Sequence, residues 1–439
     1  MNEMPPRRDS STIAPTDFEK EVCIEGWVQD VRALGGIAFV LVRDRDGVIQ
    51  IAVPKKKVTP ELFAGITGIP RESVIRVNGI VKESKQAKAG FEIVPTSFEV
   101  MSEARTPLPM GVVDKVSVEF ETRFNNRYMD LRKPEVRAVF ELKSLTLHLI
   151  DQYLTQQRFI EVFTPKIVAS GAEGGATLFK VDYFGRAAYL AQSPQLYKQM
   201  LMSTGLDRVY EMGPAFRAEP FDTIRHVSEF VSFDAEMAHI CSMRDVMDVL
   251  EECVQFTVKG VAEQGKDQLA RLGAEVKVPS TPYPVLTYAQ AVEMVQAEGH
   301  KITMGEDLAT EGEKLLGDLM TGKGNDLYWI IEYPEEAKPF YIMEKDGTPF
   351  SYSFDLDYRG QEIASGGQRE HRYAPLVERM KKKGLDPDSF QFYLNAFAYG
   401  MPPHGGWGLG LERLVQKMLG LPNIREAILF PRDRYRLVP

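Results

Sequence analysis

The chain has 439 residues, of which 44% are hydrophobic and 26% are charged, and its formal net charge is -9. This length exceeds one ordinary hydrophobic core, so we expect at least two domains. The composition is that of a globular protein, and no apolar run reaches the roughly 18 residues that a membrane span needs. The acidic balance argues against nucleic-acid binding, because phosphate backbones favour basic faces, but it permits a local basic surface.

The first 17 residues are polar and contain prolines, so they predict a short loose arm without the apolar core of a signal peptide. The cysteines, Cys23, Cys241 and Cys253, are sparse and odd in number. This usage is typical of reduced thiols in a cytoplasmic protein, and no pair of them has the spacing of metal ligands. We therefore expect a cytoplasmic protein without a zinc site.

Residues 18–103 predict a small β-barrel. Apolar runs at 22–28, 37–42, 48–53, 74–81 and 91–94 predict strands, and residues 60–66 between the third and fourth predict a helix. This order is that of a five-stranded OB-fold barrel, which binds oligonucleotides on one face, although other small barrels share the strand count. Lysines at 55–57 and at 82, 85 and 88 fit either a nucleic-acid-binding surface or a solvated face.

Residues 104–133 predict a hinge or linker, and the apolar spacing of residues 134–157 predicts a long helix. Beyond residue 159, strands and helices alternate without a repeated βαβ unit. This pattern favours a mostly antiparallel sheet flanked by helices over residues 134–439, with a helix-rich insertion at about 238–345. The expected fold class is therefore α+β, with two domains.

Two segments before residue 200 carry polar groups suited to a small ligand. The segment at 163–175 leads from a strand into a glycine-rich loop with one acid, Glu173, which is either an exposed loop or a lid that caps an ammonium group. The segment at 191–199 contains Ser193, Gln195 and Lys198. It is either the polar start of a surface helix or a site that fixes a small polar ligand.

Residues 210–237 predict a hairpin with a cation, Arg217, beside Phe216 on a strand. An arginine there suits an anionic ligand such as a phosphate, and the alternative is a buried arginine–glutamate pair.

Residues 360–371 and 405–414 are rich in glycine, which lets the backbone approach a ligand closely. No βαβ unit surrounds the second segment, so we exclude a dinucleotide-binding site. Arg413 can instead meet a triphosphate. Glu362 and Ser365 are hard oxygen ligands suited to Mg²⁺, or else they form one exposed helical face.

These segments together closely resemble the signature motifs of the class II aminoacyl-tRNA synthetases, nearest to the archaeal and eukaryotic type of aspartyl-tRNA synthetase. Motif one corresponds to the helix that ends near Phe159 together with Pro165. Motif two is FRAE at 216–219 through FDAEM at 233–237, and motif three is GLGLER at 408–413. The resemblance covers about residues 22–439 and implies an enzyme that uses ATP as a substrate and Mg²⁺ as a cofactor.

The resemblance implies the following roles. Arg217 holds the α-phosphate of ATP, Glu219 reads the adenine amino group and Phe233 stacks on the adenine ring. The remaining ATP-binding residues are Arg225, His226 and Arg413 at the outer phosphates, with Gly410, Leu411 and Glu412 beside them. Glu362 and Ser365 bind Mg²⁺. The aspartate-binding residues are Glu173, Ser193 and Gln195 around the ammonium, Lys198 and Arg369 at the side-chain carboxylate, and Arg217 and Ser365 nearby. Arg217 and Arg413 are the expected catalytic residues.

The implied reaction has two steps: aspartate and ATP form aspartyl-adenylate and pyrophosphate, and the 3′-end of tRNA(Asp) then takes the aspartyl group. Two cations at the amino-acid site favour aspartate over asparagine, and we expect no editing site. The alternatives are an asparaginyl-tRNA synthetase and an asparagine-synthetase-like ligase on the same fold. The family also implies a homodimer through motif one.

In the barrel, the resemblance assigns anticodon recognition to Phe39, Gln50 and Glu92. Phe39 would stack on a base, although a core position in the barrel is the alternative. Two further positions bear on tRNA choice. Gln29 stands where discriminating archaeal relatives tend to have tryptophan, which leaves open that tRNA(Asn) is also charged, whereas Lys88 matches the discriminating pattern.

Overall fold

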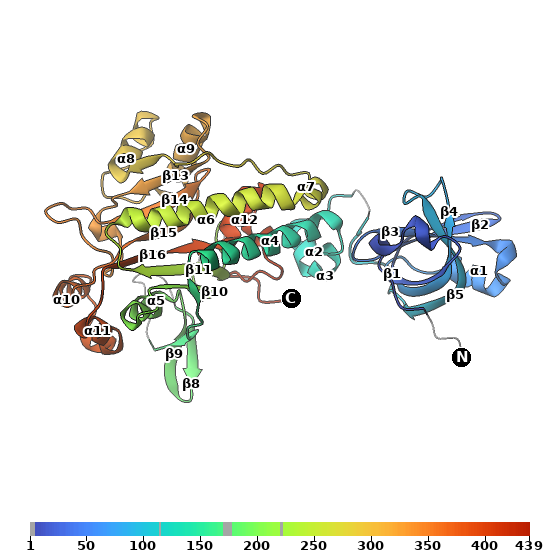
Figure 1. Cartoon of the computed structure of the whole chain (residues 1–439), viewed down its shortest axis with the longest axis horizontal. Coiled ribbons are helices and arrows are strands. Elements are labelled where there is room, and N and C mark those ends of the chain that lie inside the picture. Colours follow the sequence, from blue (N-terminus) through green and yellow to red (C-terminus); the bar gives the residue numbers. More distant parts are fainter. Residues whose placement is uncertain (1–4, 114–115, 170–177, 220–222) are drawn as a thin grey trace. The chain divides into compact units, whose positions relative to one another are not determined.

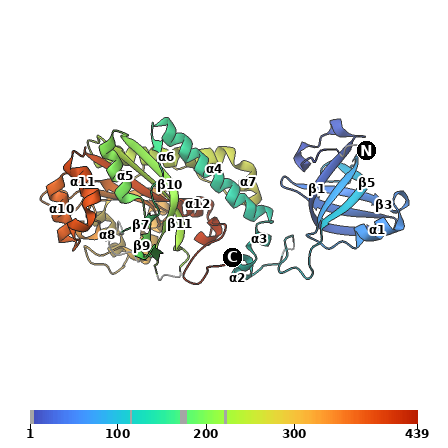
Figure 2. The same ribbon diagram turned by 90° about the horizontal axis from the view of Figure 1, so that it is seen from below.

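The structure is a computed structural model that describes residues 5–113, 116–169, 178–219 and 223–439 (Figures 1 and 2). It forms two compact units, Met1–Thr122 and Arg123–Pro439. The division falls inside the segment that the sequence predicts as a linker. Each unit is described by itself below.

The first unit is a closed five-stranded barrel, as the sequence predicts. Its strands follow the order β1-β2-β3-β5-β4 around the barrel. They are β1 (Glu21–Leu34), β2 (Ile37–Arg43), β3 (Val48–Pro54), β4 (Val74–Glu83) and β5 (Phe91–Ser102). Helix α1 (Pro60–Thr67) follows β3. Thr59 caps its N-terminus, because the Thr59 side chain accepts a hydrogen bond from the backbone N–H of Leu62. Alternate residues fill the interior, among them Val28, Val40 and Ile51.

The predicted loose arm is wrong for its described part, residues 5–17. Ile13 is buried in the core of the barrel. The backbone N–H of Arg8 donates to the carbonyl of Cys23 at 2.8 Å, and the hydroxyl of Ser10 donates to Asp44 at 2.6 Å. Burial of one apolar side chain and these bonds outweigh the entropy of a free terminus.

The second unit is built on a sheet with the order β12-β13-β14-β15-β16-β11-β10-β6. Within the described residues of this sheet, only the β12·β13 and β6·β10 pairs are parallel, so the prediction of a mostly antiparallel sheet is confirmed. The strands are β6 (Ile160–Glu161), β10 (Arg208–Phe216), β11 (Glu229–Ala238), β12 (Val285–Thr287), β13 (Leu327–Ile331), β14 (Ser353–Tyr358), β15 (Glu362–Gln368) and β16 (His404–Gly410).

Two long helices run side by side along this sheet, α4 (Pro134–Gln156) and α6 (Met243–Gln264) (Figure 1). Apolar residues of α4 and α6, such as Leu149 and Val254, share one core with Trp407 of β16. The amphipathic pattern of residues 134–157 therefore predicts α4 correctly.

The interval 238–345 does not form one separate insertion. It supplies α6 to the main core and β12 and β13 to the main sheet. Helices α8 (Tyr288–Ala297) and α9 (Ala309–Gly322) pack on a smaller core of their own. Charge and helical spacing predict the helices, but they do not reveal that strands from this interval join the sheet.

The remaining elements surround the sheet. A small sheet has the order β7-β9-β8, from β7 (Ile167–Val168), β8 (Lys180–Tyr183) and β9 (Arg186–Leu190). The other helices are α2 (Phe120–Asn125), α3 (Arg127–Asp130), α5 (Gln195–Leu201), α7 (Lys266–Leu272), α10 (Tyr373–Lys382), α11 (Gln391–Ala398) and α12 (Leu411–Leu419). Within the described residues, none of the helices combines the length and apolar character of a transbilayer helix.

Candidate active site

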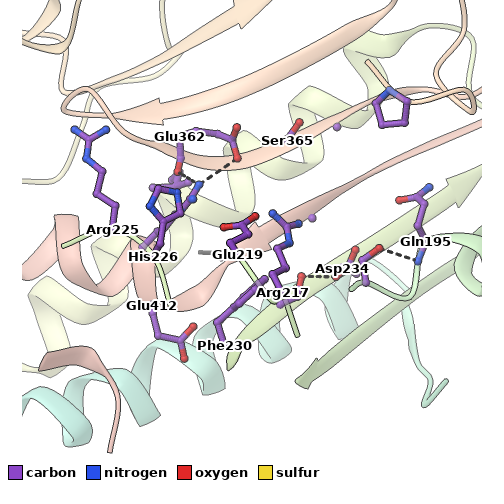
Figure 3. Close-up of a pocket in the computed structure, with 18 of the residues that line it drawn as sticks. Gln195, Arg217, Glu219, Arg225, His226, Phe230, Asp234, Glu362, Ser365 and Glu412 are labelled. Carbon is purple, nitrogen blue, oxygen red and sulfur yellow. Dashed lines mark hydrogen bonds and ion pairs between the residues drawn. The ribbon is translucent and has the colours of Figure 1, made fainter. Parts of the chain in front are cut away.

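A cavity of about 270 Å³ lies over the central strands of the second unit. Residues from β11, β15 and β16 and from the loop between β10 and β11 line it (Figure 3). The predicted site residues that line it are Ser193, Gln195, Arg217, Glu219, Arg225, His226, Glu362, Ser365, Arg369, Gly410, Glu412 and Arg413. The fold thus brings together residues that lie up to about two hundred positions apart in the chain.

Basic side chains gather at one end of the cavity, near Glu362 (Figure 3). The guanidinium of Arg413 donates to the Glu362 carbonyl at 3.1 Å and lies 3.3 Å from its carboxylate. Arg225 pairs with Glu313 of α9 at 2.7 Å and donates to the carbonyl of Gly360 at 3.1 Å. Burial and the nearby Arg413 lower the pKa of His226, which keeps that ring neutral at physiological pH. This end suits an anion with several charges, such as a triphosphate.

Phe230 lines the cavity, and the assignment of Phe233 to the adenine ring is wrong. Phe233 is 1% exposed, and its ring stacks on Tyr210 in the core with centroids 5.7 Å apart. Phe230 lines the cavity instead, with its ring centroid 5.4 Å from the guanidinium carbon of Arg217. Side chains alternate along β11, so Phe230, Ser232 and Asp234 face the cavity while Phe233 faces away. On a strand, the residues that share a face with Asp234 include Phe230 and exclude Phe233, so this two-residue period favours Phe230 as the residue that stacks on adenine.

The residues of motif three divide between the cavity and the core. Leu411 is fully buried in the core, so its side chain does not reach the cavity, contrary to its assignment to the ATP site. Glu412 lines the cavity, but its carboxylate is already bound to Lys143 at 2.6 Å and to the backbone N–H of Val231 at 3.0 Å. Glu412 therefore anchors α12 to α4 and β11, and Arg413 is the motif-three side chain that presents a charge to a ligand.

Four charged side chains form a buried cluster at the other end of the cavity. The ammonium of Lys198 lies 2.9 Å from Asp234 and 3.5 Å from Glu236, and it donates to the carbonyl of Trp407 at 2.8 Å. Arg369 binds Glu236 through two hydrogen bonds of 2.9 and 3.2 Å. Burial alone would raise the pKa of Glu236, but Arg369 and Lys198 outweigh burial and hold it below the ordinary value. Glu236 therefore stays ionised and fixes the Arg369 guanidinium.

Because Asp234 and Glu236 accompany the two cations, the cluster has no net formal charge. Lys198 and Arg369 are predicted site residues, whereas their acidic partners Asp234 and Glu236 are not. Arg369 lines the cavity together with Arg217, whereas Lys198 lies behind Asp234 and is itself 2% exposed. Asp234 and Glu236 stand in the FDAEM motif. They are two positions apart on a strand, so their side chains point to the same face, and this spacing is the signal in the sequence that could have identified them as partners of the cations.

The polar residues near this cluster come from the start of α5. Gln195 is 4% exposed and donates through its amide to Gln199 at 2.9 Å, and it lines the cavity with Ser193. Both residues share the cavity with Asp234. Because Gln195 is buried, the alternative of a polar helix start on the surface is wrong for it. Glu173 lies outside the described residues.

Glycines in β16 make room for the buried acids. Gly408 pairs with Asp234 and Gly406 pairs with Glu236 across β11 and β16. A Cβ atom on Gly406 would lie 2.1 Å from the carbonyl oxygen of Ala235 and 2.2 Å from the Glu236 carboxylate. Gly406, just before motif three, is therefore required by packing against β11, in addition to any approach by a ligand.

Glu362 and Ser365 lie on strand β15 and line the cavity, so the alternative of an exposed helical face is wrong. Asp355 of β14 pairs directly with Ser365, and Asp357 pairs with Glu362. Burial and the neighbouring Asp355 raise the pKa of Glu362. Carboxylate and hydroxyl oxygens beside a phosphate-binding end fit Mg²⁺ chemically. Within the described residues, no three acids, histidines or cysteines are arranged around one metal position.

In the barrel, the predicted anticodon residues lie on the outer face. Phe39 alternates with the buried Ala38 and Val40, so the alternative of a core position is wrong. Gln50 donates to the Glu92 carboxylate at 3.0 Å across β3 and β5. Leu41 of β2 pairs with Gln50 on one side and with Asp30 of β1 on the other.

The two tRNA-discrimination positions stand in different elements, one in strand β1 and one in the turn between β4 and β5. Gln29 sits where the β1·β2 register shifts between Val28 and Asp30, so it has no directly paired residue on β2. It therefore neighbours the row of Asp30, Leu41 and Gln50. Lys88 is exposed in the turn between β4 and β5.

Comparisons with known proteins agree with this arrangement. The family of class II tRNA synthetases (D, K and N) matches residues 119–434, and the family of OB-fold nucleic acid binding domains matches residues 22–101. The chain is 53% identical over 422 residues to the aspartate–tRNA(Asp) ligase of Pyrococcus horikoshii, with 96% of both chains covered. It is 49% identical over 431 residues to the aspartate–tRNA(Asp/Asn) ligase of Methanothermobacter thermautotrophicus, with 98% of both covered.

Among solved structures, the chain resembles asparaginyl-tRNA synthetase from Pyrococcus horikoshii complexed with asparaginyl-adenylate. The TM-score is 0.92 at 32% sequence identity, with 99% of this chain and 100% of that chain covered.

Proposed function

The chain belongs to the class II tRNA synthetases of the D, K and N group, and we propose that it activates aspartate with ATP and transfers it to tRNA(Asp). The observation that carries this proposal is the single cavity with basic side chains at one end and the Arg369–Glu236 pair at the other. The first end suits the triphosphate, and the second suits the side chain of the amino acid. A cavity with these two ends holds the triphosphate and the amino acid close to each other, which is a large source of rate in such a reaction.

In the first step, the α-carboxylate oxygen of aspartate forms a bond to the α-phosphorus of ATP, and pyrophosphate leaves. Arg217 lies between the two ends of the cavity and stabilises the charge on the α-phosphate (Figure 3). Phe230 stacks on adenine, and Arg225 and Arg413 neutralise the outer phosphates. In the second step, a ribose hydroxyl of the terminal tRNA adenosine attacks the activated carbonyl and AMP leaves. No covalent intermediate with the protein is required.

Aspartate is favoured over asparagine because of the donors that face it. A carboxylate offers acceptor atoms on both oxygens, whereas an amide replaces one of them with an NH₂ donor. The guanidinium of Arg369 has N–H donors alone, and its orientation is fixed by ionised Glu236. Asparagine would therefore leave a donor facing a donor, which is costly in a buried site. The two relatives, both named as aspartate–tRNA ligases, support aspartate as the substrate.

We propose that Glu362 and Ser365 hold the Mg²⁺ that accompanies ATP. The metal would supply positive charge to the phosphate oxygens during their displacement. Glu362 pairs with Arg413 across the same end of the cavity, so its carboxylate lies where the outer phosphates are expected.

The outer face of the barrel is the proposed anticodon surface. Phe39 offers an aromatic face to an unstacked base, and the bonded pair Gln50–Glu92 offers donors and acceptors to base edges. The relatives include ligases named for tRNA(Asp) and for tRNA(Asp/Asn), and we propose that this surface decides which of the two tRNAs is charged.

We further propose a homodimer through the motif-one region. Strand β6 is the last strand of the sheet, and Ile160 within it is 45% exposed. Phe163, just beyond this strand, is 79% exposed. An apolar edge of this kind is suited to a second copy of the chain, and sedimentation of the purified protein tests it.

The buried free thiols of Cys23 and Cys253 support a reducing, cytoplasmic location.

Amino-acid-dependent exchange of labelled pyrophosphate into ATP tests the activation step. Exchange with aspartate and not with asparagine supports the proposal, and the reverse result overturns the substrate. Charging of tRNA(Asp) transcripts with labelled aspartate tests the transfer step, and its absence would leave a ligase that does not use tRNA.

A further inference from the structure

Four buried polar side chains form a chain of hydrogen bonds behind the amino-acid end of the main cavity, which holds the proposed active site. They are Gln195 and Gln199 of α5, Tyr393 of α11 and His404 of β16. Gln195 is 4% exposed, and the other three are fully buried. Gln195 and Gln199 stand one helical turn apart, so their side chains share a face of α5. Of the four, Gln195 lines the cavity.

The carbonyl of Pro402 fixes which nitrogen of the His404 ring carries the proton. Nδ1 of His404 lies 2.9 Å from this carbonyl oxygen. Because a carbonyl can only accept, Nδ1 is the protonated nitrogen and donates to it. Burial lowers the pKa of His404 to about 4, so the ring is neutral at physiological pH and carries no second proton. The other ring nitrogen, Nε2, is therefore an acceptor.

This acceptor determines the orientation of the Gln199 amide. The amide nitrogen of Gln199 lies 3.1 Å from Nε2 of His404 and donates to it. The amide oxygen of Gln199 is then the group that accepts from the amide nitrogen of Gln195, at 2.9 Å, and from the hydroxyl of Tyr393, at 3.3 Å. A hydroxyl can donate or accept, so Tyr393 fits either orientation of this amide, whereas neutral His404 fits only one.

The orientation passes from Gln199 to Gln195. The amide nitrogen of Gln195 is committed to Gln199, so the atom that Gln195 offers to a ligand in the cavity is its amide oxygen. The α-ammonium of an amino acid has donors alone, and an oxygen is the partner that it needs. A reversed amide would set an NH₂ donor against the ammonium, and such a mismatch is costly in a buried site.

We propose that His404 is a positioning residue for the amino-acid substrate, which acts through Gln199 to keep the amide oxygen of Gln195 toward the α-ammonium. Gln199 stands between His404 and Gln195, so His404 acts through two successive hydrogen bonds. This role rests on the proposed activation of aspartate, and it adds a source of selectivity for ligands that carry a protonated α-amino group.

Two stable analogues of aspartyl-adenylate test this role. One keeps the α-amino group, and its deamino counterpart has hydrogen in that place. Calorimetry with the full-length protein measures the dissociation constant of each. Wild type should bind the amino form at least about tenfold more tightly, as expected for one hydrogen bond to a charged group. His404→Leu removes the acceptor, so it should bind the amino form about tenfold more weakly than wild type and the deamino form within about twofold.

Tyr393→Phe is the matched control. It deletes one hydrogen bond to the Gln199 amide but leaves the one that determines its orientation, so the ratio of the two dissociation constants should stay that of wild type. His404→Gln should retain most of the wild-type ratio, because its amide oxygen can accept from Gln199 as Nε2 does. Gln199→Met interrupts the chain in its middle, and it is a second test variant that should lose the selectivity. Thermal melting verifies that each variant is folded.

The role of His404 is overturned if wild type binds the two analogues equally, or if folded His404→Leu or Gln199→Met keeps the wild-type ratio. It is also overturned if these variants weaken both analogues to the same extent, since that result indicates general damage to the site. Loss of selectivity in Tyr393→Phe, or an equal loss in His404→Gln and His404→Leu, would likewise contradict it. Failure of the proposed function is distinct, because wild type would then bind neither analogue.

Discussion

The ammonium of Lys198 lies 2.9 Å from a carboxylate oxygen of Asp234, and each side chain is 3% exposed. Removal of one member of a buried ion pair costs about 3–5 kcal/mol, because the other charge is left uncompensated. Lys198→Met should therefore lower kcat/KM for aspartate by about 10²–10³-fold or more in pyrophosphate exchange, by disordering Asp234 and Glu236 beneath the amino acid.

Lys166 offers a matched control for this variant. It pairs with Glu211 at 2.6 Å in the same unit but does not line the main cavity. Lys166→Met should retain the wild-type KM for aspartate. Equal aspartate kinetics in Lys198→Met and wild type would contradict the role of the buried cluster.

The glycine at 406 should be intolerant of any side chain. A Cβ atom there would meet the carbonyl of Ala235 at 2.1 Å and the carboxylate of Glu236 at 2.2 Å. Gly406→Ala should destabilise the protein by about 3 kcal/mol, since the strands β11 and β16 must separate to admit it. Gly322→Ala is the control, because a Cβ there has no heavy atom within 4 Å. Denaturant midpoints of the two variants provide the measurement, and equal midpoints would refute the packing argument.

Buried His404 should make stability depend on pH. Burial lowers its pKa from 6.5 to about 4, so the folded protein keeps the ring neutral where the unfolded chain takes up a proton. Stability from this group is therefore complete above pH 6.5 and declines as the pH falls towards 4, by about 3 kcal/mol in total.

His404→Gln tests this dependence, because glutamine can still bond to Gln199 but does not titrate. The denaturation midpoint of the variant should fall less than that of wild type between pH 6.5 and 4. Replacement of the exposed His239 by glutamine should leave the wild-type slope intact. Parallel curves for His404→Gln and wild type would show that another group is responsible.

Local patterns in the sequence predict the barrel strands and the helix α4, and the family motifs predict about half of the residues that line the cavity. Alternating apolar residues mark β2 and β3 because one side of each strand is buried in the barrel, as Ala38 and Val40 are. The motif residues Arg217, Glu362 and Arg413 meet in one cavity because they stand on neighbouring parts of the same fold.

Long-range pairing accounts for what the sequence did not reveal. The partners of Lys198 and Arg369 are acids on β11, and the register of β11 against β16 decides that both acids face the cations. Phe233 was misassigned because a motif gives the order of residues but not the face of the strand. Lys338 lines the cavity but carries no motif, and its position beside Asp355 depends on how the loop after β13 returns to β14.

The half-buried ring of Phe39 should contribute to tRNA binding and not to adenylate formation. Stacking of a base on an aromatic side chain is worth about 1–3 kcal/mol, so Phe39→Ala should lower kcat/KM for tRNA(Asp) by roughly 5- to 150-fold. Pyrophosphate exchange with aspartate should remain at the wild-type rate, since the barrel and the cavity belong to separate units. Phe63 packs on the barrel core, so its replacement by alanine is the comparison for a loss of barrel stability. A tRNA kcat/KM equal to wild type in Phe39→Ala would contradict the anticodon role.

Gln29 should influence the choice between tRNA(Asp) and tRNA(Asn). It lies where the β1 register shifts, next to the row of Asp30, Leu41 and Gln50 on the outer face. A bulky indole there would narrow the space for an anticodon base, so Gln29→Trp should lower the ratio of tRNA(Asn) to tRNA(Asp) charging by about tenfold, a difference of about 1.4 kcal/mol. Labelled aspartate and the two transcripts provide the measurement, with Lys88→Ala as the comparison in the β4–β5 turn. The prediction is contradicted if wild type charges no tRNA(Asn), or if the ratio of tRNA(Asn) to tRNA(Asp) charging is unchanged in Gln29→Trp. In that case Gln29 does not determine which tRNAs are charged. The Lys88 variant then shows whether the β4–β5 turn does.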